Sequence, residues 1–549
     1  MSAARREMFR KYESEVDFSR NYGRVKAMVT GLLTGDALRA KTMRGGAWLG
    51  IGSVAEQAIR FIRNILLARL LAPGAFGTMA IVVSSASVVD TLTDVGLRAA
   101  IIQNPRGEEE VYLNASWWLG MGRAIFSYIV IFAIAPWISH FYGRAELAGL
   151  LRVALLGILF NGVISPRSAL AQRKMKLGHW AAITNGGGIC GVILAVALSF
   201  FVRDVWALAI GFCSENAFRW LLSYLICPGL PSLGWDRRAV RELLTFSRGI
   251  FGLAFLNLIV ARADVFVLAR LYSSASLGLY TLAVTLVTTP SVFFTNMLAQ
   301  TLLPALSSVQ KDTSRVNGIL LEVTSWLILL GLPVGVAIFL CSQSLLTVIY
   351  GARYVAAAGP LAVASIVVLI TVINAMTTGV LFAKGRPELH RQAVAASAAT
   401  MILAIYPAIR FWGLIGGQIA GLLSIAVGYL LQVFYLRAIT GLNLFRYGSI
   451  FVPPTLGSAA MLGIVLGSRF LGLALKPVTD IALCLGSGAV VSAVCVLAHL
   501  RALRRREEFY SLRTSESAAA FKSCPDLALG PVSTPIETAG NSYRHSASN

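Results

Sequence analysis

Three charged residues lie at helical spacing inside an apolar segment near the start of the chain. Glu56, Arg60 and Arg63 are four and three residues apart, so a helix places all three on one face, with Asn64 beside them. A charge at the centre of a membrane helix costs about 2.5–3.5 kcal/mol, and three together cost about 8–10 kcal/mol. The stripe must therefore face other protein or a wet cavity rather than lipid.

The next apolar segment carries charges at the same spacing, in Asp90, Asp94 and Arg98. Two interpretations stay open and are compatible with each other. In one, a buried ion-pair network joins the two segments, with Arg60 or Arg63 on Asp90 or Asp94. In the other, the arginines line a wet vestibule that receives an anionic headgroup.

The second half of the chain offers a more neutral polar surface. Asn257 and Asp264 share a helical face, whereas Glu215 and Arg219, four residues apart in an earlier segment, are expected to pair within one helix. A further segment aligns hydroxyl and amide side chains on one face: Thr281, Thr285, Thr288 and Asn296. Such a face suits sugar hydroxyls, and close helix packing through small polar residues is the alternative.

The composition places these segments in a membrane. Of 549 residues, 56% are apolar and 13% are charged, against about 25% charged in soluble proteins. The seven cysteines form no CxxC pair and the five histidines are scattered, so we expect neither a metal site nor a cofactor. No P-loop is present, which excludes ATP hydrolysis, and no catalytic constellation indicates an enzyme. In a membrane protein, basic residues concentrate in the cytoplasmic loops. We therefore attribute the net charge of +22 to such loops rather than to a nucleic-acid-binding surface.

Stretches of about 20 apolar residues predict an all-α polytopic membrane protein with about 14 transmembrane helices. Their cores are 46–70, 76–100, 114–138, 148–166, 180–202, 205–227, 249–271, 277–303, 319–341, 358–382, 392–409, 413–436, 450–470 and 479–499. Lys and Arg are concentrated in alternate loops and in both tails, which predicts that both termini are cytoplasmic.

An internal repeat divides the chain. Residues 67–71 read Leu-Ala-Arg-Leu-Leu and residues 268–272 read Leu-Ala-Arg-Leu-Tyr, while Gly77 and Gly278 keep the same offset of 201. Six spans separate the copies, so the halves share one orientation, and such repeats place a substrate site at their interface. The predicted organisation is a basic cytoplasmic N-tail (1–43), an N-lobe (44–227), a cytoplasmic linker (228–248), a C-lobe (249–436), two further spans (437–500) and a disordered cytoplasmic C-tail (501–549).

Several short stretches resemble a known family in the right order. Leu67–Gly77 is similar to the first hairpin of polysaccharide flippases of the Wzx/PST type, within the MATE-like flippase superfamily. Phe141–Leu147, Ala171–Lys176, and Tyr350-Gly-Ala-Arg-Tyr354 resemble later loops of that family. The resemblance covers about residues 44–440, and the chain departs from the family at Leu177, which stands where many members have Phe.

The resemblance implies two pseudo-repeated six-helix bundles around a central cavity, with two C-terminal helices added. It implies that the protein moves undecaprenyl-pyrophosphate-linked oligosaccharide across the bacterial inner membrane for exopolysaccharide or lipopolysaccharide biosynthesis. Arg60, Arg63 and Arg98 are then candidates for binding the pyrophosphate. The candidates for coupling to a proton or sodium ion, or for ion pairing, are Glu56, Asp90, Asp94 and Asp264. Asn64 and the polar residues of the second half become cavity candidates.

Alternatives remain at this point. A multidrug cation exporter of the same superfamily would favour an acidic cavity, which the arginines argue against, whereas a lipid II flippase would share the cationic one. A membrane glycosyltransferase or polysaccharide polymerase would need a sizeable external loop, and the external loops here are short. A scaffold for polysaccharide assembly, with polymerase or assembly proteins as partners besides membrane lipids, is the third class.

Overall fold

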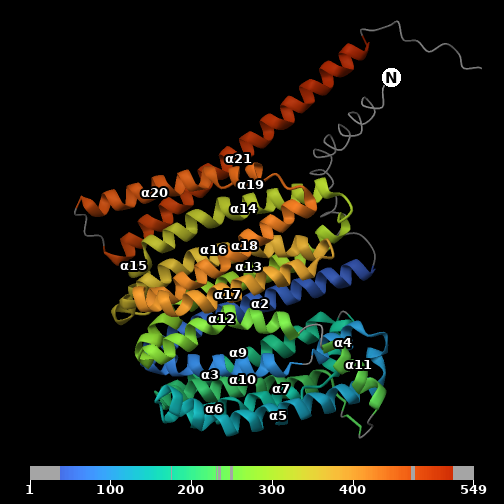
Figure 1. Cartoon of the computed structure of the whole chain (residues 1–549), viewed down its shortest axis with the longest axis vertical. Coiled ribbons are helices and arrows are strands. Elements are labelled where there is room, and N and C mark those ends of the chain that lie inside the picture. Colours follow the sequence, from blue (N-terminus) through green and yellow to red (C-terminus); the bar gives the residue numbers. More distant parts are fainter. Residues whose placement is uncertain are drawn as a thin grey trace, which may run out of the picture. The chain divides into compact units, whose positions relative to one another are not determined.

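The computed structural model describes residues 37–94, 96–174, 176–229, 231–232, 236–247, 251–471 and 476–522. Within these residues the chain is helical, with no strand (Figure 1). The described residues from 37 to 496 form one compact unit, and the last part of the final helix belongs to a second unit. The predicted all-α membrane fold is confirmed.

The helices of the first half begin with α2 (Ala37–Leu70), α3 (Pro73–Thr93), α4 (Leu97–Gln103) and α5 (Glu110–Tyr142). They continue with α6 (Glu146–Ala154), α7 (Leu156–Gly162), α8 (Arg167–Arg173), α9 (Leu177–Phe201), α10 (Val205–Ile226) and α11 (Arg237–Ser247). Short 3₁₀ turns cover Pro105–Glu108 and, in the second half, Ala352–Ala357.

The second half contains α12 (Phe251–Leu271), α13 (Ser274–Ser308), α14 (Thr313–Leu340), α15 (Ser342–Ile349), α16 (Ala358–Ala383), α17 (Pro387–Trp412) and α18 (Leu414–Thr440). The short α19 (Leu444–Ser449) leads to α20 (Val452–Phe470) and α21 (Pro477–Lys522). Local sequence sets several ends: Pro73 occupies the first turn of α3, and Gly143 ends α5 with a φ of 64°.

Eleven helices among the described residues are long and apolar enough to cross a membrane, and one bent helix pair brings the number to as many as 12. α2 and α10 are not among them, and these two helices carry the charged residues described below. The protein is therefore a multi-pass membrane protein, and predicted spans outside this set stay predictions.

Three segments differ from the sequence prediction. The span expected over 76–100 ends at Thr93, because the chain turns at Gly96, whose φ of 57° is left-handed, before α4 begins. The span expected over 148–166 is divided between α6 and α7, and the path bends by 60° before α8. The predicted linker contains α11, whose Ala239 and Leu243 are buried in a cluster with residues of α4 and α5.

The C-terminal tail also differs in part. The final span was expected to end near residue 499 and disorder to follow from 501, but α21 continues as a helix to Lys522. Residues 523–549 and the predicted N-tail up to residue 36 lie outside the described residues.

The repeated glycines meet each other. A Cβ added at Gly77 would overlap the carbonyl oxygen of Ser274 and lie 2.8 Å from the Gly278 nitrogen. A Cβ added at Gly278 would overlap the carbonyl oxygen of Pro73 and lie 3.0 Å from the Gly77 nitrogen. The first turns of α3 and α13 therefore pack backbone against backbone, and the two copies of the repeat contact through equivalent positions.

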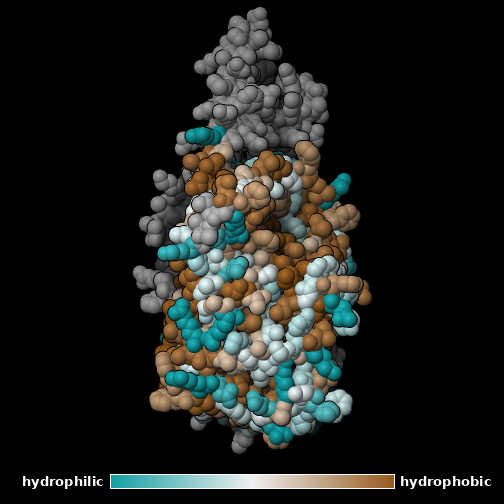
Figure 2. Space-filling view, turned by 90° about the vertical axis from the view of Figure 1, so that its left-hand side faces the viewer, coloured by the Kyte–Doolittle hydropathy of each residue, from teal (hydrophilic) through white to brown (hydrophobic). Residues whose placement is uncertain are grey.

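Further hydrogen bonds join the two halves at this same end, which we call the glycine end. The Tyr354 hydroxyl donates to the Ala68 carbonyl at 2.9 Å, and Arg353 donates to that carbonyl as well. Arg69 donates to the carbonyl of Val348 at 3.0 Å, and Arg144 to that of Tyr272 at 3.1 Å. Figure 2 looks onto the end of the molecule where α15 lies, and polar residues gather on this face with hydrophobic residues at its sides.

Candidate functional site

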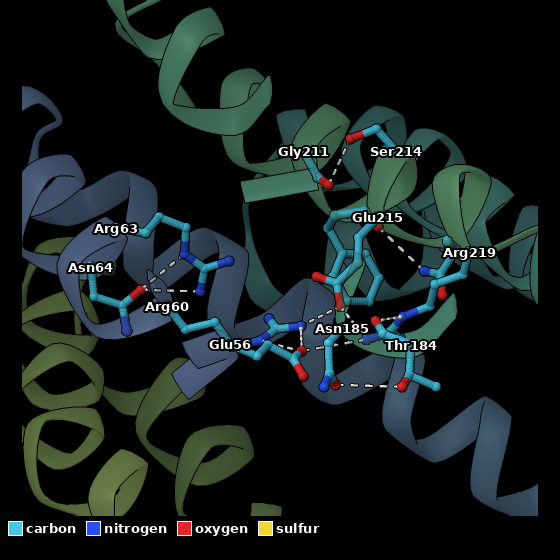
Figure 3. Close-up of polar contacts among 12 residues, drawn as sticks. Glu56, Arg60, Arg63, Asn64, Thr184, Asn185, Gly211, Ser214, Glu215 and Arg219 are labelled. Carbon is cyan, nitrogen blue, oxygen red and sulfur yellow. Dashed lines mark hydrogen bonds and ion pairs between the residues drawn. The ribbon is translucent and has the colours of Figure 1, made fainter. Parts of the chain in front are cut away.

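The charged stripe of α2 forms a four-residue ion cluster with α10 (Figure 3). Arg60 donates from Nε and Nη2 to Glu56 Oε1 at 3.0 and 2.8 Å, and its Nη2 also donates to Glu215 Oε1. Arg219 Nη2 lies 2.7 Å from Glu215 Oε1 and 3.8 Å from Glu56 Oε1. Each carboxylate thus serves both guanidinium groups, and the four charges cancel.

The pair within α10 confirms the expectation that Glu215 and Arg219 interact inside one helix. Its role as the anchor for Arg60 was not predicted. No contact between α2 and α10 was predicted, because the spacing of residues within one helix does not show which other helix packs against it.

Glycines of α9 allow the cluster to form. A Cβ at Gly188 would lie 2.7 Å from Glu56 Oε1, and one at Gly191 would lie 2.7 Å from the Glu215 Cα. α2 and α10 both pack on α9, and larger residues at these positions would push them away. The run Asn185-Gly-Gly-Gly-Ile-Cys-Gly191 was the sequence feature that could have indicated this approach.

Arg63 lies one turn beyond the cluster and is not part of it. Its Nε and Nη2 donate to Asn64 Oδ1 at 3.2 and 3.1 Å, and among the described residues it has no carboxylate partner. Figure 3 shows its side chain with Asn64, apart from the cluster. The four cluster residues and Arg63 together therefore carry one net positive charge, and Arg63 is the member of this group without a carboxylate partner among the described residues.

The predicted ion pairs between Arg60 or Arg63 and Asp90 or Asp94 are wrong. α2 packs on α9 and α13, whereas α3 packs chiefly on α13 and α12, so the two helices diverge after their shared turn. Asp90 pairs instead with Arg123 of α5 at 3.1 Å. Asp94 lies beyond the end of α3, where its Oδ1 accepts from the Gly96 amide at 2.9 Å.

Arg98 is not brought to this site. It lies on α4, beyond the turn that ends α3, and its Nε and Nη2 donate to Gln172 Oε1 at 3.1 and 2.8 Å. Its guanidinium also stacks 3.4 Å from the ring centroid of Trp180. The structure thus gives Arg98 partners of its own, apart from the α2–α10 region.

Asp264 belongs to a separate hydrogen-bonded chain in the second half. Tyr280 donates to Asp264 Oδ2 at 2.5 Å, Gln418 Nε2 donates to the Tyr280 hydroxyl at 2.6 Å, and the Val265 amide donates to Asp264 Oδ1 at 2.8 Å. This chain connects α12, α13 and α18. The repeat offset of 201 relates Asp264 to Arg63, so equivalent positions of the two halves carry opposite charges.

The polar residues predicted for the second half make local hydrogen bonds. Thr281, Thr285 and Thr288 each donate to the carbonyl four residues earlier in α13. The Asn257 amide donates to the Leu253 carbonyl at 3.1 Å, and Asn296 is exposed. The three threonines and Asn257 thus bond within their own helices, and whether any of these five side chains meets a substrate stays a prediction.

The cluster makes a prediction about stability. Glu215→Gln leaves Arg60 and Arg219 with one carboxylate between them, and uncompensated buried charge costs about 3–5 kcal/mol. We expect the free energy of unfolding to fall by about that amount, measured by titrating detergent-solubilised protein with dodecyl sulfate. Glu109→Gln is the matched control, because Glu109 pairs with Arg106 at the surface. This substitution should lower the free energy of unfolding by less than about 1 kcal/mol. Equal effects of the two substitutions would show that the cluster does not hold α2 to α10.

The arrangement of the helices places this protein among multi-pass membrane proteins of known fold. The fold is similar to that of a solved membrane protein: the structure of lipid II flippase MurJ in an inward closed conformation matches with a TM-score of 0.68 at 14% identity. That match covers 83% of this chain and 99% of the flippase.

The family follows from the sequence comparison. The model of the polysaccharide biosynthesis protein family matches residues 66–359, and the chain belongs to this family. The lipopolysaccharide biosynthesis protein WzxC of Escherichia coli K12 is 23% identical over 397 residues, which are 72% of this chain and 79% of that protein. The succinoglycan biosynthesis transport protein ExoT of Rhizobium meliloti is also 23% identical, over 58% of this chain and 64% of that protein. The predicted family is thus confirmed.

Proposed function

We propose that this protein moves undecaprenyl-pyrophosphate-linked oligosaccharide repeat units from the cytoplasmic to the periplasmic leaflet of the bacterial inner membrane. The product would supply exopolysaccharide or lipopolysaccharide biosynthesis. Membership of the polysaccharide biosynthesis family and a relative named as a transport protein support this class of activity. One observation links this activity to a site: the guanidinium of Arg63 in α2 has no carboxylate partner among the described residues.

The chemistry of Arg63 suits a pyrophosphate. A guanidinium offers a planar set of donors that binds phosphate oxygens in a bidentate manner and stays charged in a membrane. Arg60 is the weaker candidate, because Glu56 and Glu215 already accept its hydrogen bonds. The cluster would act as the fixed support that presents Arg63 and Asn64 to the substrate.

Translocation would proceed by alternating access between the two lobes. We propose that both termini are cytoplasmic, that the glycine end consequently faces the periplasm, and that its contacts open during each cycle. Asp264 is the candidate for coupling to an ion, because it is the acid of a buried network in the second half. One elementary charge that crosses 100 mV supplies about 2.3 kcal/mol.

The experiment compares membrane vesicles from a deletion strain with vesicles that carry the restored gene. We expect the deletion to trap completed lipid-linked repeat units on the cytoplasmic face, with secreted polymer lost, and the restored gene to move them across. Sidedness is measured with a membrane-impermeant glycosidase or lectin, and an ionophore added to the restored vesicles tests the ion coupling. Repeat units already on the periplasmic face of the deletion strain would instead indicate a polymerase or ligase step.

A further inference from the structure

A second site lies at the glycine end, away from the charged cluster. An open cavity of about 860 Å³ is lined by α14, α15, α16, α20 and the start of α21. Its polar wall includes Ser344, Arg469 and Asp480, and its apolar wall includes Phe339, Leu462 and Leu466. None of these residues belongs to the proposed path of the substrate.

The polar end of the cavity is built around a buried carboxylate. Asp480 is 6% exposed and accepts a hydrogen bond from the Ser344 hydroxyl at 2.6 Å and from Arg469 Nη2 at 3.0 Å. The same Nη2 donates to the Leu340 carbonyl at 2.7 Å. Arg469 is therefore held in place by Asp480 and the Leu340 carbonyl, and it also makes a side-chain hydrogen bond with Cys484. Its side chain is still 40% exposed, and this exposed part of the guanidinium is available to a ligand.

The cavity has a charged end and an apolar wall, which match the charged headgroup and the apolar chain of a lipid. Arg469 lies in the last turn of α20, and Leu466 and Leu462 follow at intervals of three and four residues toward the middle of that helix. The distance along the helix from Arg469 to Leu462 is about 10 Å. Leu462, Leu466 and Phe339 are all partly exposed on helices that qualify as membrane spans. A charged end at the membrane surface thus leads into an apolar wall that continues toward the bilayer centre.

The charge at this end matches a single phosphodiester. Arg469 and Asp480 line the cavity and their charges cancel, and the exposed Lys476, which directly precedes the lining residue Pro477, adds a net charge of +1 beside it. A phosphatidylglycerol headgroup carries one negative charge, whereas zwitterionic phospholipids carry none. We propose that this cavity binds an anionic phospholipid of the leaflet at the glycine end, with the phosphate on Arg469 and an acyl chain along Leu462 and Leu466.

The test uses the full-length chain, purified in detergent and stripped of lipid. Phosphatidylglycerol, phosphatidylcholine and undecaprenyl phosphate are added separately, and binding is followed by native mass spectrometry and by the shift in melting temperature. We expect a saturable shift with phosphatidylglycerol that phosphatidylcholine does not produce. The double variant Arg469→Gln with Asp480→Asn keeps the net charge and leaves no buried unpaired acid, and it should weaken binding at least about tenfold.

Two further variants make the result decisive. Leu462→Trp fills the apolar wall while the pair of Arg469 and Asp480 remains intact, and it should also weaken binding. Arg410→Gln removes an exposed arginine from the last turn of α17 outside the cavity, and it should bind as the parent does. Unchanged binding in both cavity variants overturns the proposal, as does a shift with undecaprenyl phosphate but with neither phospholipid. Transport activity is not a readout here, so the outcome is independent of the proposed function.

Discussion

Replacing Gly77 or Gly278 by alanine will sharply reduce transport, by at least about tenfold in the vesicle assay. Alanine within a helix is normally favoured over glycine by about 1 kcal/mol, so helix propensity alone predicts a small gain in stability. The contact between α3 and α13 reverses that expectation, because a Cβ at either position would overlap a carbonyl oxygen of the opposite helix. The glycine end could then no longer close, and alternating access needs it closed in one half of the cycle.

Gly74→Ala is the matched control for this prediction. Gly74 lies in the same turn of α3, but a Cβ there would meet its nearest neighbour, Ser274, at an ordinary 3.8 Å. A cysteine placed at Thr281 in a background without native cysteines reports the state of this end through its reaction with an impermeant thiol reagent. We expect faster labelling in Gly77→Ala and Gly278→Ala but not in Gly74→Ala. Normal transport in both alanine variants would show that this contact is not part of the cycle.

Arg63→Gln should abolish most transport while leaving the fold intact. A phosphate that loses a hydrogen-bonded guanidinium loses about 2–5 kcal/mol of binding, which corresponds to a decrease in affinity of about 30-fold or more. The free energy of unfolding should change little, because Arg63 has Asn64 as its partner and no carboxylate among the described residues. The measurements are the flipping rate in vesicles as a function of substrate concentration and the dodecyl sulfate titration of the purified protein.

Comparison with neighbouring variants separates substrate binding from structure. Arg63→Lys keeps the charge but loses the planar pair of donors, so it should retain partial activity. Arg60→Gln should lower stability and transport together, because it removes the group that links Glu56 to Glu215. Arg63→Gln with a normal flipping rate would remove Arg63 from the proposed site and leave the family assignment standing.

The membrane fold and the repeat were available from the sequence alone. Long apolar segments determine the class, because backbone groups in lipid must be satisfied within helices. Gly77 and Gly278 were identified by their shared offset, and a repeat of like orientation places equivalent positions near its axis. The local pair of Glu215 and Arg219 was also predictable, since residues four apart on one helix are neighbours whatever surrounds them.

Tertiary structure decided which of the buried charges meet. Spacing along one helix shows which residues share a face, but it carries no information about the helix that covers that face. Sequence adjacency suggested α3 as the partner of α2, whereas packing on the glycines of α9 brings Glu215 of α10 to Arg60 instead. As a result, Arg63 has no carboxylate partner among the described residues, and Asp90 pairs with Arg123. The site is therefore defined by helix packing between segments about 155 residues apart, which no local pattern encodes.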